Sequence, residues 1–263
     1  MYWNRPLLKA NAKKVLSTSY WNVFIVCFIS GLLGNIGTGA NAFTNFSAGF
    51  NNGMSGVDEV VGEEGAGLFL SIFGTSFLVA ILLGIFVGAP LAVGANRFMM
   101  ENRGGNPPIS SMFSVFRDSK QYWNVVKVMF FLGLELSLWS LLCFIPGIYK
   151  AYQYFYVPYL LAENPYMSYS RAKQLSRAMT NNEKMEIFVL ELSFFGWVFL
   201  GTMLCGIGTL FVSPYISATF AELYAAARAK AFNLGVTDST ELADFTHYID
   251  PMNGSTGTPY NSL

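Results

Sequence analysis

Six apolar runs divide this chain of 263 residues, and they constrain its fold more than any other feature. A helix that crosses a membrane needs about 20 predominantly apolar residues, and most of the runs are close to that length or longer. The runs cover residues 20–36, 68–93, 125–144, 148–162, 187–212 and 214–227. Only 12% of the residues are charged, roughly half the share found in soluble domains. The sequence therefore predicts an all-α polytopic membrane protein with six transmembrane helices.

The order of the runs predicts three hairpins, each preceded by an amphipathic interfacial helix. The three interfacial helices are expected within residues 7–16, 109–119 and 168–179. Tyr20-Trp21-Asn22-Val23 and Tyr122-Trp123-Asn124-Val125 repeat the same four residues at the entry to two of the hairpins, which indicates an internal repeat. The fourth run covers only about 22 Å at 1.5 Å per residue. We therefore expect it to tilt or to be partly buried among its neighbours.

The lysines and arginines lie almost entirely on one side of this arrangement. Of the sixteen, only Lys150 falls at the outer end of a hairpin, beside the Pro146-Gly147 turn. Short loops rich in Lys and Arg stay in the cytoplasm, so both termini are predicted to be cytoplasmic. The basic cytoplasmic surface is expected to contain Lys9, Lys13, Lys14, Arg117, Arg171, Lys173 and Arg177.

The chain reads as one membrane domain followed by a tail. Residues 1–231 are predicted to form the six-helix domain, with an external loop at 37–66, and residues 232–263 to form a flexible cytoplasmic tail. The external loop carries four carboxylates, at Asp58, Glu59, Glu63 and Glu64. Their spacing differs from that of a calcium-binding loop, which favours a solvated acidic loop over a cation site.

Four ionisable residues are candidates for a site inside the membrane: Glu135, Glu191, Glu222 and Lys150. Glu135 and Glu222 lie roughly 12–16 Å from the outer ends of their helices, and Glu191 lies nearer the cytoplasmic end. Charged groups at such depth are costly and commonly mark proton or ion pathways. The alternative is that these glutamates are protonated, or that they are hydrogen-bonded to hydroxyl groups and join helices together.

Aromatic residues and the remaining motifs point to anchoring and packing. Trp21, Trp123, Tyr152 and Tyr156 are expected to be interfacial anchors, with a ligand cage among the tyrosines as the alternative. The sole histidine, His247, lies in the tail. We therefore expect no catalytic residue, no metal site, no cofactor and no nucleic-acid partner.

Several motifs resemble a bacterial family of integral membrane proteins known as domain of unknown function 975. They are Ile145-Pro146-Gly147-Ile148, Ala162-Glu163-Asn164-Pro165, Leu192-Ser193-Phe194-Phe195-Gly196-Trp197, Gly206-Ile207-Gly208 and Pro214-Tyr215. The segment from Arg5 to Trp21 also resembles the opening of the family, so the resemblance extends from about Arg5 to Ala229. It implies a multi-pass protein of the bacterial plasma membrane and brings no assigned activity.

The sequence thus predicts a non-enzymatic membrane accessory protein, or a module that binds lipid or a partner. Membrane lipids are the expected partners, with a membrane-protein partner or a homo-oligomer as further options. The main alternative is a small transporter or channel that uses Glu135 and Glu222. A weaker alternative is a membrane enzyme that acts on lipid.

Overall fold

The computed structural model describes residues 3–34, 75–76, 78–142, 144–203 and 207–245, and every regular element within them is helical. The predicted all-α class is therefore confirmed for this part of the chain. The expected external loop at 37–66 lies outside the described residues. In chain order the elements are α1 (Arg5–Gly34), the π-helical turn η1 (Gly84–Gly88), α4 (Ala89–Asn102), the 3-10 helix η2 (Ile109–Phe116), α5 (Ser119–Leu142), α6 (Phe144–Gln153), α7 (Val157–Glu163), α8 (Tyr169–Met179), α9 (Lys184–Met203) and α10 (Ile207–Asn233).

Four of the described helices are long and apolar enough to cross a membrane. They are Arg5–Leu32, Leu78–Asn102, Ser119–Leu142 and Lys184–Met203. These helices correspond to the first, second, third and fifth predicted runs, and they indicate a membrane protein. The long helix α10, with 27 residues and Pro214 inside it, contains the sixth run.

The fourth predicted run is not one continuous helix. It is divided between α6, with 10 residues, and α7, with 7 residues. Pro158 lies in the first turn of α7, where the missing N–H is tolerated and the fixed backbone angle favours a new helix start. Each piece is shorter than a membrane span, and Leu160 and Leu161 in α7 are completely buried within the protein.

Helix α10 forms the centre of the packed region. It packs against α1, α9 and α4, and its residues from Ala221 to Ala231 are all buried. Near the start of α10, Gly208 faces Gly201 of α9 so closely that a Cβ on Gly208 would lie 2.6 Å from the Gly201 Cα. Small residues allow helices to approach in this way, and α9 and α10 therefore form a close hairpin.

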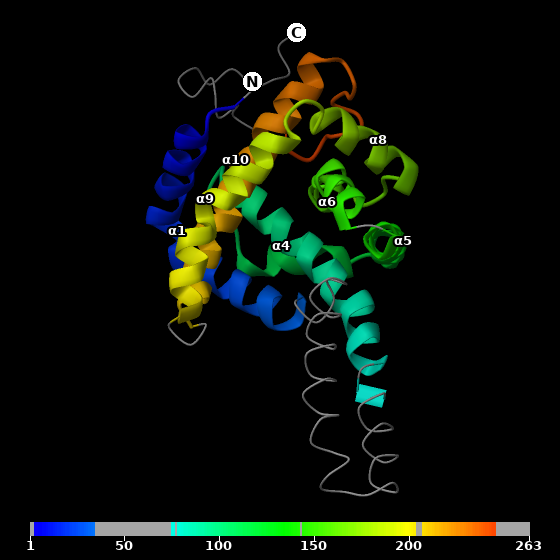
Figure 1. Cartoon of the computed structure of the whole chain (residues 1–263), viewed down its shortest axis with the longest axis horizontal. Coiled ribbons are helices and arrows are strands. Elements are labelled where there is room, and N and C mark those ends of the chain that lie inside the picture. Colours follow the sequence, from blue (N-terminus) through cyan, green and yellow to red (C-terminus); the bar gives the residue numbers. More distant parts are fainter. Residues whose placement is uncertain (1–2, 35–74, 77, 143, 204–206, 246–263) are drawn as a thin grey trace, which may run out of the picture.

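The described helices run in two main directions. In Figure 1, α5 and α6 are seen close to end-on, whereas α4, α9 and α10 run across the plane of the view. Helix α1 changes direction at Ser19, whose backbone is not helical (φ −125°). This kink separates the half of α1 that carries the lysines from its apolar half.

The chain beyond α10 is packed as far as it is described. The sequence predicted a flexible tail from residue 232, but α10 continues to Asn233 and the following segment folds back on the helices. Leu242 is completely buried and Phe245 is nearly so. We refer to residues 236–245 as the C-terminal segment.

Candidate functional site

Glu222, one of the predicted intramembrane carboxylates, is half of a buried ion pair. The Arg103 guanidinium donates from Nε to Glu222 Oε1 at 2.7 Å and from Nη2 to Oε2 at 3.0 Å. The two side chains are only 10% and 4% exposed. The sequence pattern does not indicate this partner, because Arg103 lies beyond the end of the second apolar run. The packing of α4 against α10 brings the two charges together.

Glu135, the second predicted carboxylate, is also paired. It forms an ion pair with Lys173 of α8 and accepts a hydrogen bond from the Tyr169 hydroxyl. The Tyr154 hydroxyl donates to Glu135 Oε1 at 2.9 Å. The expected pairing with hydroxyl groups is thus partly met, although by tyrosines rather than by serines or threonines. The ammonium of Lys173 is the additional partner that the sequence pattern did not reveal.

Lys150 lies among other cations rather than apart from them. Its Nζ is 5.6 Å from the centroid of the Tyr154 ring, and Nζ of Lys173 is 5.0 Å from the same centroid. Arg177 donates to the Tyr154 hydroxyl at 2.6 Å. Glu135, Lys150, Tyr154, Tyr169, Lys173 and Arg177 together form what we call the Tyr154 cluster. It joins a lysine predicted outside the membrane to two basic residues predicted inside.

The expected aromatic anchors divide into two groups. Trp21 and Trp123 are 68% and 57% exposed, as is typical of side chains that face a membrane interface. Tyr152 is partly buried and donates to Glu191 of α9. The side chain of Tyr156 is fully buried, and its hydroxyl has no hydrogen-bond partner among the described residues. The break between α6 and α7 turns these tyrosines toward the protein interior.

Two further buried ion pairs join α10 to its neighbours. Arg228 Nε donates to Glu163 Oε1 at 2.8 Å, and Lys230 Nζ lies 3.1 Å from Glu183 Oε1. Arg228 and Lys230 follow the sixth apolar run, and the charge pattern places them at its cytoplasmic end without indicating partners. No local spacing could have revealed their partners, which lie on or next to other helices.

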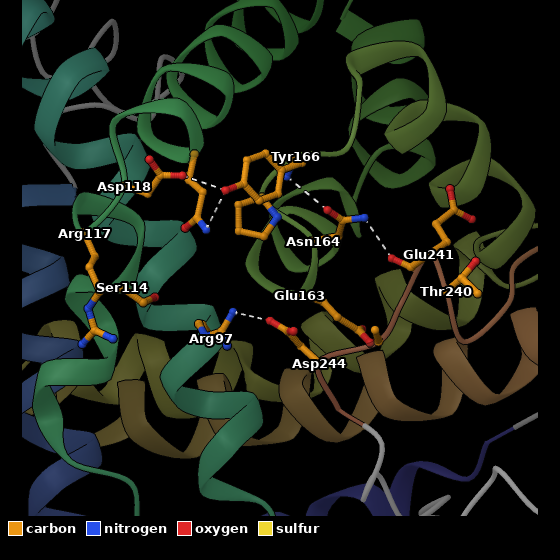
Figure 2. Close-up of a pocket in the computed structure, with 13 residues that line it drawn as sticks. Arg97, Ser114, Arg117, Asp118, Glu163, Asn164, Tyr166, Thr240, Glu241 and Asp244 are labelled. Carbon is orange, nitrogen blue, oxygen red and sulfur yellow. Dashed lines mark hydrogen bonds and ion pairs between the residues drawn. The ribbon is translucent and has the colours of Figure 1, made fainter.

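A polar pocket of about 360 Å³ lies where α4, α5, the α7–α8 connection and the C-terminal segment meet. Figure 2 shows side chains from all four parts directed toward it. Its lining residues are Arg97, Ser114, Arg117, Asp118, Gln121, Glu163, Asn164, Pro165, Tyr166, Thr240, Glu241, Ala243 and Asp244. The family-like motif at Ala162–Pro165 therefore forms part of its wall.

The C-terminal segment is held at this pocket by ion pairs. Arg97 Nη1 donates to Asp244 Oδ2 at 2.8 Å, and Arg171 Nε donates to Glu241 Oε1 at 2.6 Å. The Arg171 guanidinium lowers the pKa of Glu241 below its usual range. Across the pocket, the hydroxyl of Tyr166 donates to Asp118 at 2.7 Å, and this hydrogen bond lowers the pKa of Asp118.

The described carboxylates of the pocket all have a partner, whereas one of its two arginines, Arg117, has no carboxylate partner among the described residues. Glu163, Glu241 and Asp244 each pair with an arginine. Arg117 is exposed and has no carboxylate partner within the described residues. No group of three or more His, Cys, Asp or Glu side chains in the described part of the chain could hold a metal ion. The pocket is thus suited to binding a polar group.

The rest of the expected basic surface has varied surroundings. Lys9 donates to Ser193 at 2.7 Å and lies over the ring of Phe194. Lys13 lies over the ring of Tyr215, and Lys14 is exposed. The described amphipathic half of α1 therefore packs its basic face partly against α9 and α10 and leaves part of it free.

The long apolar helices indicate a helical membrane protein. Residues 69–231 match the model of a family described as Protein of unknown function (DUF975), and because this match covers more than half of the sequence, the chain belongs to that family. The predicted family is confirmed, and the segment from Arg5 to Trp21, which also resembles the family, lies outside the matched residues. A search of curated proteins and a search of solved structures each returned no match.

Proposed function

We propose that this protein is a non-enzymatic module of the bacterial plasma membrane that binds anionic lipid headgroups on its cytoplasmic side. One observation carries the proposal: a set of exposed cations has no carboxylate partner within the described residues. The set comprises Lys13, Lys14, Arg117, Lys120 and Lys127. Each Lys or Arg near an anionic leaflet contributes about 1 kcal/mol to binding.

The positions of two tryptophans support the same proposal. Trp21 follows the basic half of α1, and Trp123 lies between Lys120 and Lys127 on α5. Both indole rings are exposed. Aromatic side chains with an apolar body and a polar N–H are favoured at the headgroup level of a bilayer. Exposed cations beside exposed tryptophans fit a surface that lies against headgroups.

The proposed topology has both termini in the cytoplasm. We assign full crossings to three of the four helices that are apolar enough, α1, the Leu78–Asn102 helix and α9, and add α10 as the fourth, in place of the six crossings expected from the sequence. The α5–α6 hairpin would then enter from the cytoplasmic side and return to it. The approach of Lys150, Lys173 and Arg177 to the same Tyr154 ring supports this topology, in which Lys150 lies on the same side as the other lysines and arginines.

Labelling of single cysteines tests this topology. In intact cells, Lys150→Cys is expected to resist a membrane-impermeant thiol reagent, and to react once the cells are opened. Lys14→Cys is the matched cytoplasmic control, and Glu63→Cys in the expected external loop should react in intact cells. Labelling of Lys150→Cys from outside would restore the six-crossing arrangement.

Lipid selectivity tests the binding function. The purified full chain is mixed with phosphatidylglycerol and phosphatidylcholine, and the bound lipids are counted by native mass spectrometry. We expect phosphatidylglycerol to be retained preferentially. Replacement of Lys13, Lys14, Lys120 and Lys127 together by Gln should weaken that preference, whereas Arg at the same four positions should keep it. Equal retention of both lipids by the unmodified protein would refute the proposal.

Transport through Glu135 and Glu222 is the alternative, and the ion pairs make it less favourable. Glu135 is already engaged by Lys173 and Glu222 by Arg103, whereas a carboxylate that carries a proton or cation across the membrane must be able to exchange its partner. Proteoliposomes with an imposed pH gradient test this alternative. Dissipation of the gradient by the unmodified protein, and its loss in Glu135→Gln and Glu222→Gln, would establish transport.

A further inference from the structure

We propose that the Tyr154 cluster binds the phosphate of one anionic lipid molecule, whose acyl chains lie on the exposed apolar face of α5 and α6. The proposal rests on the proposed lipid-binding function and names a site for it. The juxtaposition that carries it is the meeting of Lys150 from α6 with Lys173 and Arg177 from α8 around one aromatic ring.

The cluster holds more positive than negative charge. Lys150, Lys173 and Arg177 supply three cations, and Glu135 is the single carboxylate paired with any of them within the described residues. Placing like charges close together is unfavourable, more so where the surroundings are partly apolar. A bound anion would remove this repulsion, so the cluster is better matched to a phosphate than to a neutral ligand.

The donor groups suit a phosphate. Lysine ammonium groups and an arginine guanidinium are the side chains that bind phosphate oxygens in charge-assisted hydrogen bonds. The Arg177 guanidinium carbon lies 5.3 Å from the Tyr154 ring centroid, and the ammonium groups of Lys150 and Lys173 lie 5.6 and 5.0 Å from the same centroid. Arg177 is exposed, while Lys173 has a side-chain exposure of only 19%. The cluster is therefore partly buried, at Lys173, and partly exposed, at Arg177.

An apolar surface borders the cluster and favours a lipid over a free phosphate. Phe131 of α5, itself exposed, packs on Tyr169 of the cluster with ring centroids 6.0 Å apart. Along the same helix, Leu134 and Leu138 are exposed one position before and one turn after Glu135. Ile148 of α6 is also exposed. An amphiphile can place its phosphate at the cations and its hydrocarbon on this surface.

The test compares cluster lysines and arginines with matched surface cations. The full chain in detergent is titrated with phosphatidylglycerol, and the tightest bound lipid is followed by native mass spectrometry. Lys150→Gln and Arg177→Gln leave the Glu135–Lys173 pair in place. Each should lower the affinity for this lipid about tenfold, as expected for the loss of one charge-assisted hydrogen bond. Arg5→Gln removes one positive charge from the partly exposed Arg5–Glu186 pair, which belongs neither to the cluster nor to the proposed headgroup surface, and it should leave binding of the tightest lipid unchanged.

A substitution of opposite sign separates binding from folding. Glu135→Gln removes the carboxylate that competes with the phosphate for Lys173. It should therefore raise the affinity for the lipid that binds most tightly. A substitution that damaged the fold would lower this affinity instead. Lys150→Arg keeps the charge and should keep the affinity. If Glu135→Gln leaves lipid affinity unchanged or weaker while its thermal unfolding matches that of the unmodified protein, the site is wrong.

The source of the phosphate is decided by competition. Inorganic phosphate and glycerol 3-phosphate carry the same charged group without hydrocarbon, and neither should displace the lipid at equal concentration. Displacement would overturn the lipid assignment in favour of a soluble phosphate. If cluster and control substitutions lowered the lipid affinity equally, the assignment of the site would be wrong, while the proposed lipid-binding function would stand. Absence of any preference for phosphatidylglycerol in the unmodified protein would overturn both.

Discussion

Arg103 and Glu222, 119 positions apart in the chain, form a two-point ion pair inside the protein. Arg103 directly follows α4, and Glu222 lies in the buried half of α10. Two parallel hydrogen bonds between a guanidinium and a carboxylate fix both distance and orientation. The pair therefore fixes how α4 lies against the central helix, as well as neutralising two buried charges.

Removal of one member of this pair should be strongly destabilising. Glu222→Gln leaves the Arg103 guanidinium buried without its counter-charge, which typically costs about 3–5 kcal/mol. Thermal unfolding in detergent measures the effect. Glu186→Gln is the matched control, because its partner Arg5 is 38% exposed and an exposed pair contributes no more than about 1 kcal/mol. The double replacement Arg103→Met with Glu222→Met should be less harmful than Glu222→Gln, and equal effects of Glu222→Gln and Glu186→Gln would contradict the prediction.

Gly94 should tolerate no side chain. A Cβ at this position of α4 would lie 1.7 Å from the main-chain oxygen of Met112, which belongs to η2. Gly94→Ala must therefore push η2 away from α4, and the melting temperature should fall markedly. Gly133→Ala in α5 provides the control, because no atom lies within 4 Å of its added Cβ. It should be neutral or stabilising by up to about 1 kcal/mol, since alanine favours helix more than glycine does. A similar loss in both variants would show that the α4–η2 contact is looser than described.

The C-terminal segment should detach in acid. Arg171 lowers the pKa of Glu241 in the folded state below the ordinary value of 4.5, so this pair stabilises the packed segment fully above about pH 4.5. The stabilisation is lost as the pH falls through the lowered pKa. Hydrogen exchange of residues 236–245, corrected for the intrinsic effect of pH, should therefore accelerate as the solution is acidified. In Glu241→Gln this segment should already exchange faster at neutral pH and respond less to acid. An unchanged profile in that variant would assign the acid response to another group.

Loss of the hydroxyl group should affect the stability of the protein differently at two buried tyrosines. Tyr156→Phe removes a buried hydroxyl that has no hydrogen-bond partner within the described chain, so stability should be unchanged or slightly increased. Tyr224→Phe removes a donor at 2.7 Å from Glu163 Oε2, and a hydrogen bond to a charged group contributes about 1.5–3 kcal/mol. Chemical or thermal unfolding of the two variants side by side measures the difference. A clear loss of stability in Tyr156→Phe would reveal a partner for its hydroxyl, such as a bound water.

Local patterns in the sequence were enough to predict the structural class of the protein. Long apolar runs require helices, and the described chain is helical wherever it is regular. The basic amphipathic stretches also became helices, at the start of α1, in η2 and in α8. These features depend on neighbouring residues only, since helix formation and hydropathy are set over a few turns. The family motifs are local as well, and the family match confirmed them.

The partners of the charged residues could not be predicted from local sequence patterns. Glu135 forms an ion pair with Lys173, and Glu222 forms one with Arg103, although the partners are far apart in the sequence. Lys173 and Arg177 of α8 reach the ring of Tyr154, which Lys150 approaches from four positions earlier in the chain. Each of these outcomes depends on how whole helices pack.

The sequence by itself determined an all-helical chain with spans apolar enough for a membrane, because hydrophobic length and helical periodicity are properties of consecutive residues. Only the tertiary structure decided which charges neutralise one another and which remain free. That outcome depends on helix packing, since a buried charge is stable only where the fold brings a counter-charge within hydrogen-bond distance. The uneven result, with Glu222 fully paired and the Tyr154 cluster left with excess positive charge, is what points to a bound anion.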